Sequence, residues 1–166
     1  MTIDREKNVF IGLGSNLGDR AGKLSAARAE LEKLAGSIRC SSVYETAPWQ
    51  VGTQPRYLNQ VCQIETELAP ERLMAKLLQI EKRLGRKRRL FRGEPRLIDI
   101  DLLIYGDRVI DARSVRVPHP RMADRAFVLA PLAELAPGLV HPVLGRTVSE
   151  LLRAADAKGV EKYAAT

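Results

Sequence analysis

The stretch from Pro95 to Tyr105, which reads PRLIDIDLLIY, constrains the fold of this chain more than any other. Every second residue in this stretch is apolar, namely Ile98, Ile100, Leu102 and Ile104. The residues that alternate with them are Asp99, Asp101, Leu103 and Tyr105. Alternation with a period of two in a β-branched run predicts a strand with one face on the core. On such a strand, Asp99 and Asp101 project together from the other face, roughly 6.5 to 7 Å apart.

The two aspartates of this strand favour a bound cation. Carboxylates at that separation repel each other unless a cation lies between them. Mg²⁺ in a phosphate site is the usual hard ion with oxygen ligands. A pair of solvent-facing aspartates on a strand is the alternative interpretation, and an Asp-x-Asp pattern alone does not exclude it.

The segments that flank the strand favour the metal site. A cationic segment from Arg86 to Arg96 precedes the strand, and Val117-Pro118-His119-Pro120 follows it as an extended turn. A run of cations is otherwise typical of a solvated or RNA-contacting patch. Next to two candidate metal ligands, the run indicates contact with phosphate groups, so the sequence predicts phosphate chemistry.

The order of the remaining elements predicts the fold class. Strands are expected at residues 9–11, 37–46 and 57–66, ahead of the aspartate strand. One helix is expected to stop at Gly36 and another to run from Pro70 to Gly85, each with an apolar stripe. Strand, helix, two strands, helix, strand is the ferredoxin-like order. We therefore expect an α+β fold, a ferredoxin-like α/β sandwich in which helices cover an antiparallel sheet, with extra C-terminal helices.

Turns and caps complete this prediction. Residues 105–107 predict a hairpin-type turn, with residues 108–110 as a brief partner strand. Residues 125–136 predict a helix, and Thr147 with Glu150 predicts a capping box that opens a final helix.

A glycine-rich turn follows the first strand and reads GLGSNLGD. It has neither the Gly-Lys-Ser/Thr ending of a Walker A loop nor the G-x-G-x-x-G spacing of a Rossmann site, so both are rejected. Ser15, Asn16 or Asp19 is expected to cap the helix that follows.

The size and charge of the chain restrict its class. Its 166 residues predict one domain, spanning residues 1–166. The net charge of +7 indicates an anionic partner, either nucleic acid or a polyphosphate. The sequence shows no signal peptide and no apolar run of membrane-spanning length. We expect a cytoplasmic monomer that contacts no membrane.

The two cysteines, Cys40 and Cys62, both fall in strand-like runs. Neither has a His or Cys neighbour at zinc-ligand spacing. We expect two buried free thiols, which are typical of a reducing compartment.

A set of short motifs, taken together, resembles the 6-hydroxymethyl-7,8-dihydropterin pyrophosphokinase family of folate biosynthesis. The motifs follow the family order from about residue 8 to residue 137, and no single one is decisive. They are Gly14-Ser15-Asn16-Leu17-Gly18, Tyr44-Glu45-Thr46-Ala47-Pro48, Tyr57-Leu58-Asn59, Gly85-Arg86, Pro95-Arg96-Leu97-Ile98-Asp99-Ile100-Asp101, and Val117-Pro118-His119 with Arg125-Ala126-Phe127.

The resemblance implies transfer of an intact pyrophosphoryl group from ATP to the hydroxymethyl oxygen of a reduced pterin, with release of AMP. It implies that Asp99 and Asp101 hold two Mg²⁺ ions on the triphosphate. Arg86 and Arg96 are then expected to stabilise the charge on the phosphates and on the leaving AMP. No general base is expected, because positioning and electrostatics can carry this kind of transfer.

The resemblance also implies two sets of ligand contacts. The pterin is expected to lie between two aromatic rings while polar groups read its amide edge; this set is Thr46, Pro48, Trp49, Tyr57, Asn59 and Phe127. The nucleotide is expected to contact Glu81, Arg88, Arg96, Ile100, His119 and Arg125.

Two positions depart from the family pattern. The family commonly carries an aromatic-Gly-Pro-Arg run before the aspartate strand, whereas this chain has Gly93-Glu94-Pro95-Arg96 with Phe91 further back. The side chain that closes this loop over the ligands is therefore undetermined by the sequence. Leu78 stands where some relatives carry a polar nucleotide contact.

Two other function classes compete with this one. A basic ferredoxin-like domain could bind RNA through its sheet, but the chain lacks the interleaved aromatic residues of an RNA-recognition sheet. Another transferase that uses ATP and Mg²⁺ with a different acceptor is the second alternative. Release of AMP on mixing ATP, Mg²⁺ and the reduced pterin separates the three.

Overall fold

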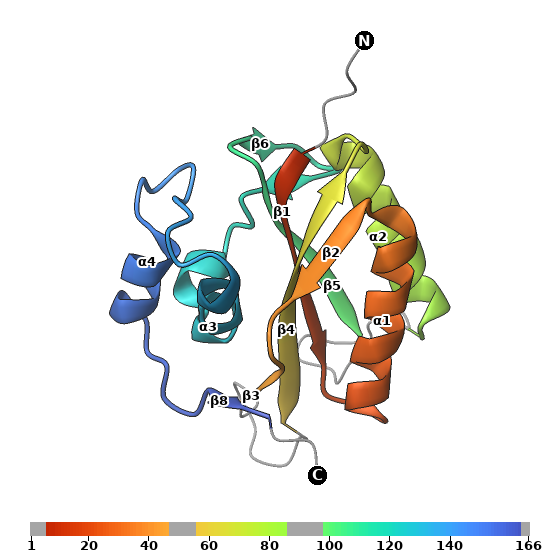
Figure 1. Cartoon of the computed structure of the whole chain (residues 1–166), viewed down its shortest axis with the longest axis horizontal. Helices are drawn as coiled ribbons and strands as arrows, with labels where there is room; N and C mark the ends of the chain where they lie inside the picture. Colours follow the sequence, from red (N-terminus) through yellow and green to blue (C-terminus); the bar gives the residue numbers. More distant parts are fainter. Residues whose placement is uncertain (1–5, 47–55, 86–97, 164–166) are drawn as a thin grey trace.

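A twisted antiparallel sheet forms the centre of the molecule (Figure 1). The computed structural model describes residues 6–46, 56–85 and 98–163. Within these residues the strands run in the order β5-β1-β4-β3-β8, and β2 also pairs with β4. The strands are β1 (Glu6–Ser15), β2 (Ser37–Cys40), β3 (Tyr44–Thr46), β4 (Tyr57–Thr66), β5 (Asp99–Tyr105) and β8 (Glu161–Lys162), and a separate pair comprises β6 (Ile110–Asp111) and β7 (Arg116–Val117).

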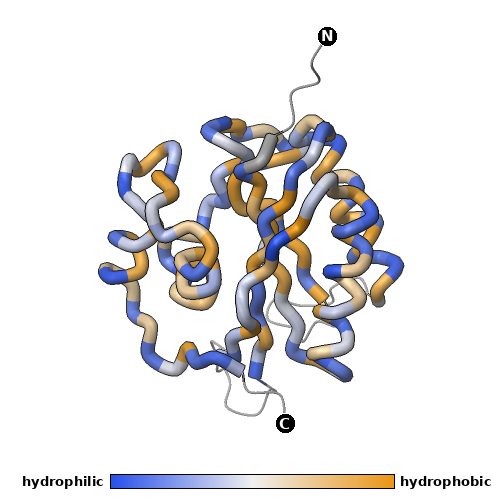
Figure 2. The backbone as a smooth tube through the Cα atoms, viewed as in Figure 1, coloured by the Kyte–Doolittle hydropathy of each residue, from blue (hydrophilic) through white to orange (hydrophobic). Residues whose placement is uncertain are grey.

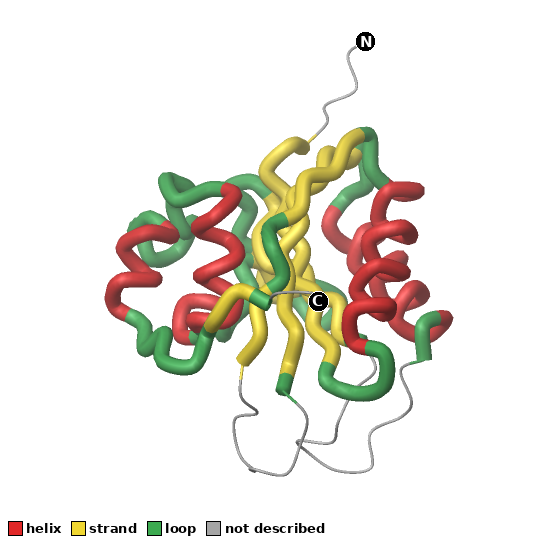
Figure 3. The backbone as a smooth tube through the Cα atoms, turned by 60° about the horizontal axis from the view of Figure 1, so that its bottom comes forward, coloured by secondary structure: helices red, strands yellow, loops and turns green. Residues whose placement is uncertain are grey.

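Helices cover both faces of the sheet, which makes three layers (Figure 3). Helices α1 (Arg20–Leu34) and α2 (Pro70–Arg83) lie on one face. The other face carries α3 (Ala126–Leu135) and α4 (Val148–Ala154), with the 3₁₀ helix η1 (Met122–Asp124) just before them. This arrangement confirms the predicted α+β sandwich with extra C-terminal helices.

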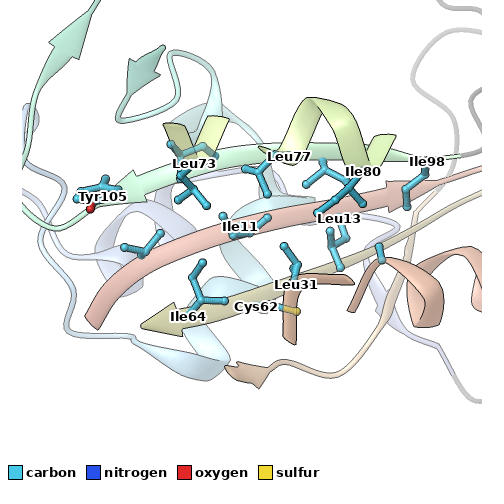
Figure 4. Close-up of a cluster of buried hydrophobic side chains, with 14 of the residues drawn as sticks. Ile11, Leu13, Leu31, Cys62, Ile64, Leu73, Leu77, Ile80, Ile98 and Tyr105 are labelled. Atoms are coloured by element: carbon cyan, nitrogen blue, oxygen red, sulfur yellow. The ribbon is translucent and has the colours of Figure 1, made fainter. Parts of the chain in front are cut away.

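The larger core lies between the sheet and helices α1 and α2, and its apolar side chains interleave between the two layers (Figure 4). Apolar residues follow the inner strands and the inward faces of the helices (Figure 2). Fully buried members include Ile11, Leu31, Leu58, Leu77 and Ile98. Burying such aliphatic side chains contributes about 1.5 to 3 kcal/mol each.

A second core lies on the opposite face of the sheet, beneath α3 and α4. Phe10, Val61 and Leu103 point into it from three neighbouring strands. Leu129 of α3 and Val148 of α4 complete it. Because both faces of the sheet are covered by apolar layers, the central strands are buried on both sides.

The alternation of β5 breaks near its end, which corrects one prediction. Ile104 was expected on the same face as Ile100, but it lies in the second core beside Leu103. The register explains this, because Phe10 pairs with Ile104 and Ile11 pairs with Leu102, so β5 has one extra residue. Such a β-bulge reverses the faces that the following residues occupy.

The expected strand over residues 37–46 is also wrong, because it is divided into β2 and β3. Both parts pair with β4, but the residues between them leave the ladder. The Ser41 hydroxyl accepts the Val61 amide hydrogen at 3.1 Å, and the Ser42 amide donates to the Glu134 carboxylate at 2.9 Å. Side chains thus replace backbone partners at the break.

The expected partner strand at residues 108–110 pairs differently. The Gly106 turn is confirmed by its φ of 58°. Ile110, however, pairs with Val117 in the small β6-β7 sheet and not with β5. The chain therefore forms a second hairpin, which brings the segment after β7 next to β5.

The prediction of free thiols at Cys40 and Cys62 is wrong, because the structure joins them in a disulfide. The two residues are directly opposite in the β2-β4 register, with Cα atoms 4.1 Å apart. Their side chains therefore leave the same face of the sheet at adjacent positions.

Two helix caps are confirmed. The Asp19 carboxylate accepts the Gly22 amide hydrogen at 3.0 Å at the start of α1. Thr147 and Glu150 form the reciprocal capping box of α4. None of the helices in the described part of the chain combines the length and apolar character needed to cross a bilayer.

A histidine holds the loop between α3 and α4. His141 is buried, and its Nδ1 accepts two amide hydrogens, from Val143 at 3.2 Å and Leu144 at 3.1 Å. Burial lowers the pKa of His141 below its usual value. The loop therefore requires the neutral imidazole.

This histidine predicts a pH-dependent part of the stability. The folded chain resists protonation of His141. The contribution of the neutral imidazole to the free energy of unfolding is therefore complete above the unfolded pKa of about 6.5, and it is lost as the pH falls below that value. In His141→Asn, the side-chain oxygen can accept the same amide hydrogens without titrating. Urea unfolding at pH 7.5 and pH 5.5 should show the natural chain losing more stability than His141→Asn. An equal loss in both proteins would contradict this account.

Candidate functional site

The two aspartates of β5 lie at one end of the sheet, on the face that carries α3 and α4. Leu103 points into the core on that face, and alternation places Asp101 and Asp99 on the same side. Both aspartates are partly exposed. The prediction that they share one face is confirmed.

Two glycines of β1 lie opposite the two aspartates of β5. Asp99 pairs with Gly14 and Asp101 pairs with Gly12. A Cβ at Gly12 would meet the Leu103 side chain at 3.4 Å, so the missing side chains belong to the aspartate face. The Leu103 side chain therefore lies against Gly12, where a side chain on β1 would otherwise stand.

Asn59 of β4 lies on the opposite side of β1 from Asp99. It pairs with Gly14, and a Cβ at Gly14 would lie 3.1 Å from the Asn59 Oδ1. The Asn59 amide is mostly buried and donates from Nδ2 to the Thr46 hydroxyl at 3.1 Å. Asp99, Gly14 and Asn59 thus form a row across three strands. Neighbouring strands lie about 4.8 Å apart, so roughly 10 Å separates the outer members.

Tyr57 lies on the same face as Asn59, two residues earlier on β4, and pairs with Thr46. Its side chain is half-buried. An aromatic ring and a primary amide therefore stand side by side at the end of β4, as the sequence predicts. The orientation of the Asn59 amide is fixed by its bond to Thr46.

Glu81 of α2 supports the aspartate strand from the other face. It is only 3% exposed, and its Oε1 accepts the Ile100 amide hydrogen at 2.7 Å. The Ile100 side chain lies in the larger core. The amide between the two aspartates is thus held by a buried carboxylate, while a contact of Glu81 or Ile100 with a nucleotide stays a prediction.

His119 lies beside the aspartates because its amide donates to the Leu103 carbonyl at 2.8 Å. Burial lowers the pKa of His119, Asp101 opposes that shift, and Arg125 and Arg121 add to it. Its Nδ1 accepts the Arg121 amide hydrogen at 3.2 Å. The imidazole is therefore held partly buried, close to a carboxylate and two guanidinium groups.

A cavity of about 640 Å³ opens along the edge of β5. Asp101 and His119 line it together with the β6-β7 hairpin and Met74 of α2. Arg113 and Arg116 add positive charge to its wall. This volume is within the usual range for a bound small molecule.

Arg125 and Phe127 lie at the start of α3. The Arg125 guanidinium carbon is 5.6 Å from the centre of the Phe127 ring, a cation–π contact. Because α3 packs on β4, the ring and the Tyr57 strand belong to adjacent layers of one face. Among the described residues of the predicted site, Asp99, Asp101, Thr46, Tyr57 and Asn59 thus share one face of the sheet with α3, whereas Glu81 approaches from the other face.

Several predicted site residues lie outside the described residues: Pro48, Trp49, Arg86, Arg88 and Arg96. The prediction of a strand at residues 9–11 followed by a glycine-rich turn is wrong at this point, because β1 extends to Ser15 and contains both Gly12 and Gly14. Glycines two residues apart in a strand indicate a close approach, and this signal could have located the contact of Asn59 with Gly14.

The aspartates fit a hard divalent ion. Among the described residues, no group of three or more His, Cys, Asp or Glu side chains could together hold a metal. Mg²⁺ commonly takes one or two carboxylates and completes its shell with water and substrate phosphates. Two partly exposed carboxylates suit that mode of binding and do not suit a closed protein cage.

Comparisons with known proteins show the family of this chain. The family model for 7,8-dihydro-6-hydroxymethylpterin-pyrophosphokinase (HPPK) matches residues 10–137. A 2-amino-4-hydroxy-6-hydroxymethyldihydropteridine pyrophosphokinase of Aquifex aeolicus is 40% identical over 142 residues, which cover 86% of this chain and 88% of that protein. The protein of the same name from Methylorubrum extorquens is 45% identical over 156 residues, which cover 92% and 96%.

A solved structure shares the fold. The Plasmodium falciparum HPPK-DHPS wild type with SDX-DHP aligns with a TM-score of 0.70 and 15% identity, over 92% of this chain. This chain spans 45% of that longer chain, so the likeness concerns one part of it.

The Glu81 contact predicts a stability effect. Glu81→Ala leaves the Ile100 amide without its acceptor, and an unsatisfied buried donor costs about 1 to 3 kcal/mol. Glu81→Gln keeps an acceptor oxygen and should recover much of that loss. Urea unfolding of both variants measures the difference, and equal stability of the two would show that the acceptor contributes little.

Proposed function

The chain belongs to the 7,8-dihydro-6-hydroxymethylpterin-pyrophosphokinase family and acts as a pyrophosphokinase on hydroxymethyldihydropterin in folate biosynthesis, and we propose that ATP is its donor and Mg²⁺ its metal. The observation that carries this proposal is the row of Asp99, Gly14 and Asn59 across three strands. It places the Asp99 carboxylate and the Asn59 amide two strands apart, with a glycine that carries no side chain between them.

The row divides the site into two halves. Asn59, Thr46 and Tyr57 form the pterin half, because an amide and a ring suit a flat heterocycle with an amide edge. Phe127 stacks on the face of the pterin opposite Tyr57. The same set includes Pro48 and Trp49, which lie outside the described residues.

Asp101, His119 and Arg125 belong to the nucleotide half, beside the cavity along β5. His119 and Arg125 contact the phosphates or the ribose of ATP. Within the same half, Glu81 of α2 holds Ile100 of β5, and both support the nucleotide. Arg88, which lies outside the described residues, is assigned to the same half. The glycines of β1 allow the two ligands to meet.

The reaction moves an intact pyrophosphoryl group. The hydroxymethyl oxygen of the pterin attacks the β-phosphorus of ATP, and the bond from that phosphorus to the oxygen shared with the α-phosphate breaks. AMP leaves with the electron pair of that bond, and the hydroxyl proton passes to water. Positioning of the two substrates supplies most of the rate enhancement.

Charge stabilisation comes from two sources. Asp99 and Asp101 hold Mg²⁺, which when bound neutralises phosphate charge and acts as a Lewis acid. Arg86 and Arg96 contact the phosphates and stabilise the negative charge that develops on AMP. Arginine suits this task because its planar fork pairs with two phosphate oxygens at once.

Formation of AMP tests the whole proposal. The protein mixed with ATP, Mg²⁺ and 6-hydroxymethyl-7,8-dihydropterin should release AMP, and omission of the pterin should abolish that release. Asp99→Asn or Asp101→Asn should lower turnover by roughly two to four orders of magnitude, the several kcal/mol assigned to metal charge stabilisation. Asp107→Asn, at an exposed aspartate in the turn after β5 and away from the cavity, is a matched control for the lost charge. Near-normal turnover of both site variants at saturating Mg²⁺ would exclude the metal assignment.

Phe127 predicts a loss that is selective for the pterin. Phe127→Ala removes one stacking face and should weaken pterin binding by roughly 1 to 3 kcal/mol, the range measured for bases on aromatic rings. ATP affinity should change much less. Phe127→Leu keeps most of the apolar volume, so it separates loss of the ring from loss of packing. Calorimetry with each ligand gives both affinities, and equal losses for the two would indicate a folding defect.

A further inference from the structure

Strand β3 is short, yet its side chains reach the pterin half of the site. It has three residues, Tyr44–Thr46. Tyr44 pairs with Asn59 in the β3-β4 register, and the Thr46 hydroxyl accepts the Asn59 amide hydrogen. A displacement of β3 would therefore change the direction of the Asn59 amide. Since so short a strand has few backbone bonds, other contacts must hold it.

Glu134 of α3 holds β3 from one face. Its Oε2 accepts the Tyr44 hydroxyl hydrogen at 2.7 Å, and its Oε1 accepts the Ser42 amide and hydroxyl hydrogens, each at 2.9 Å. Burial and the bond to Glu134 raise the pKa of Tyr44 to about 12. The phenol therefore stays protonated and keeps donating.

Arg20 of α1 holds β3 from the other face. Its Nη1 lies 3.0 Å from the Glu45 carboxylate and donates to the Arg56 carbonyl at 2.7 Å. Arg56 directly precedes β4, so one guanidinium connects β3 to the start of the next strand. The guanidinium also lies over the Tyr163 ring, 5.8 Å from its centre.

The C-terminal strand closes the edge of β3. Tyr44 pairs with Lys162 and Glu45 pairs with Glu161, and the Tyr163 amide donates to the Val43 carbonyl at 2.8 Å. Strand β3 is thus held from both faces and along its free edge. The contacts come from α1, α3 and β8, three elements far apart in the sequence.

We infer that Glu134 and Arg20 are positioning residues of the pterin site, which hold β3 between them and so fix the Asn59 amide through Thr46. The inference rests on the proposed assignment of Asn59 to the pterin. Neither residue contacts the reacting atoms. Their effect should therefore appear in the affinity for the pterin and pass through Asn59.

Pterin affinity in paired variants tests this inference. Glu134→Ala and Arg20→Ala should each raise the pterin dissociation constant about tenfold, a factor equal to about 1.4 kcal/mol. The ATP dissociation constant should change less than about twofold, since a coupling that acts through contacts is local. Tyr44→Phe removes only one hydroxyl and should act in the same direction. Glu30→Ala, which breaks exposed ion pairs of α1 with Lys33 and Arg83, is the matched control and should change neither affinity.

A double-mutant cycle separates positioning from a general loss of stability. In the Asn59→Ala background, Glu134→Ala and Arg20→Ala should have little further effect on pterin binding, because the group that they orient is gone. A tenfold effect that persists in that background would overturn the inference. Unchanged pterin affinity in the single variants would also overturn the inference. The proposed function would still stand in that case if Asn59→Ala itself weakens pterin binding. If Asn59→Ala has no effect, the pterin assignment and the inference both fail.

Discussion

Strand β1 lies between β4 and β5, and its hydrogen bonds on both sides fix the rest of the structure. Ile11 and Leu13 enter the larger core from one face, and Phe10 enters the second core from the other. Further along the same face, Gly12 and Gly14 carry no side chain, and the Leu103 and Asn59 side chains of the neighbouring strands lie against them beside the aspartates. One strand therefore sets both the packing that stabilises the sheet and the position of the site.

Local patterns predicted the parts of this arrangement that depend on a single strand or helix. A period of two places Asp99 and Asp101 on one face whatever the strand pairs with, and a cap such as Asp19 depends on only a few neighbouring residues. The bulge at Leu103 is different, because it exists only in the register with β1. The disulfide of Cys40 and Cys62 likewise depends on the β2-β4 register. Pairing between distant segments has no signal in local periodicity.

Buried polar side chains fix the geometry where the sheet departs from regular pairing. At the break between β2 and β3, the Gln60 amide donates to the Ser41 carbonyl at 2.6 Å and accepts from Arg28 at 2.6 Å. Glu81 likewise fixes the position of β5, because its carboxylate accepts the Ile100 amide hydrogen. A buried polar group without a partner is costly, so each such group permits few alternative arrangements. These partners are far apart in the sequence, which is why residue type alone could not identify them.

Helix α3 connects the two sides of the proposed pterin site. Phe127 stands near its start and Glu134 near its end, and Leu129 and Leu132 between them are fully buried. Pro131 lies inside the helix and has no amide hydrogen, so it cannot donate to the Phe127 carbonyl as a regular helix would require. The Phe127 carbonyl thus loses its regular partner, while the Leu129 amide still donates to the Arg125 carbonyl at 3.0 Å. In the proposed site, the Phe127 ring therefore depends on the same helix whose end holds β3, and a shift of α3 would move the ring and β3 together.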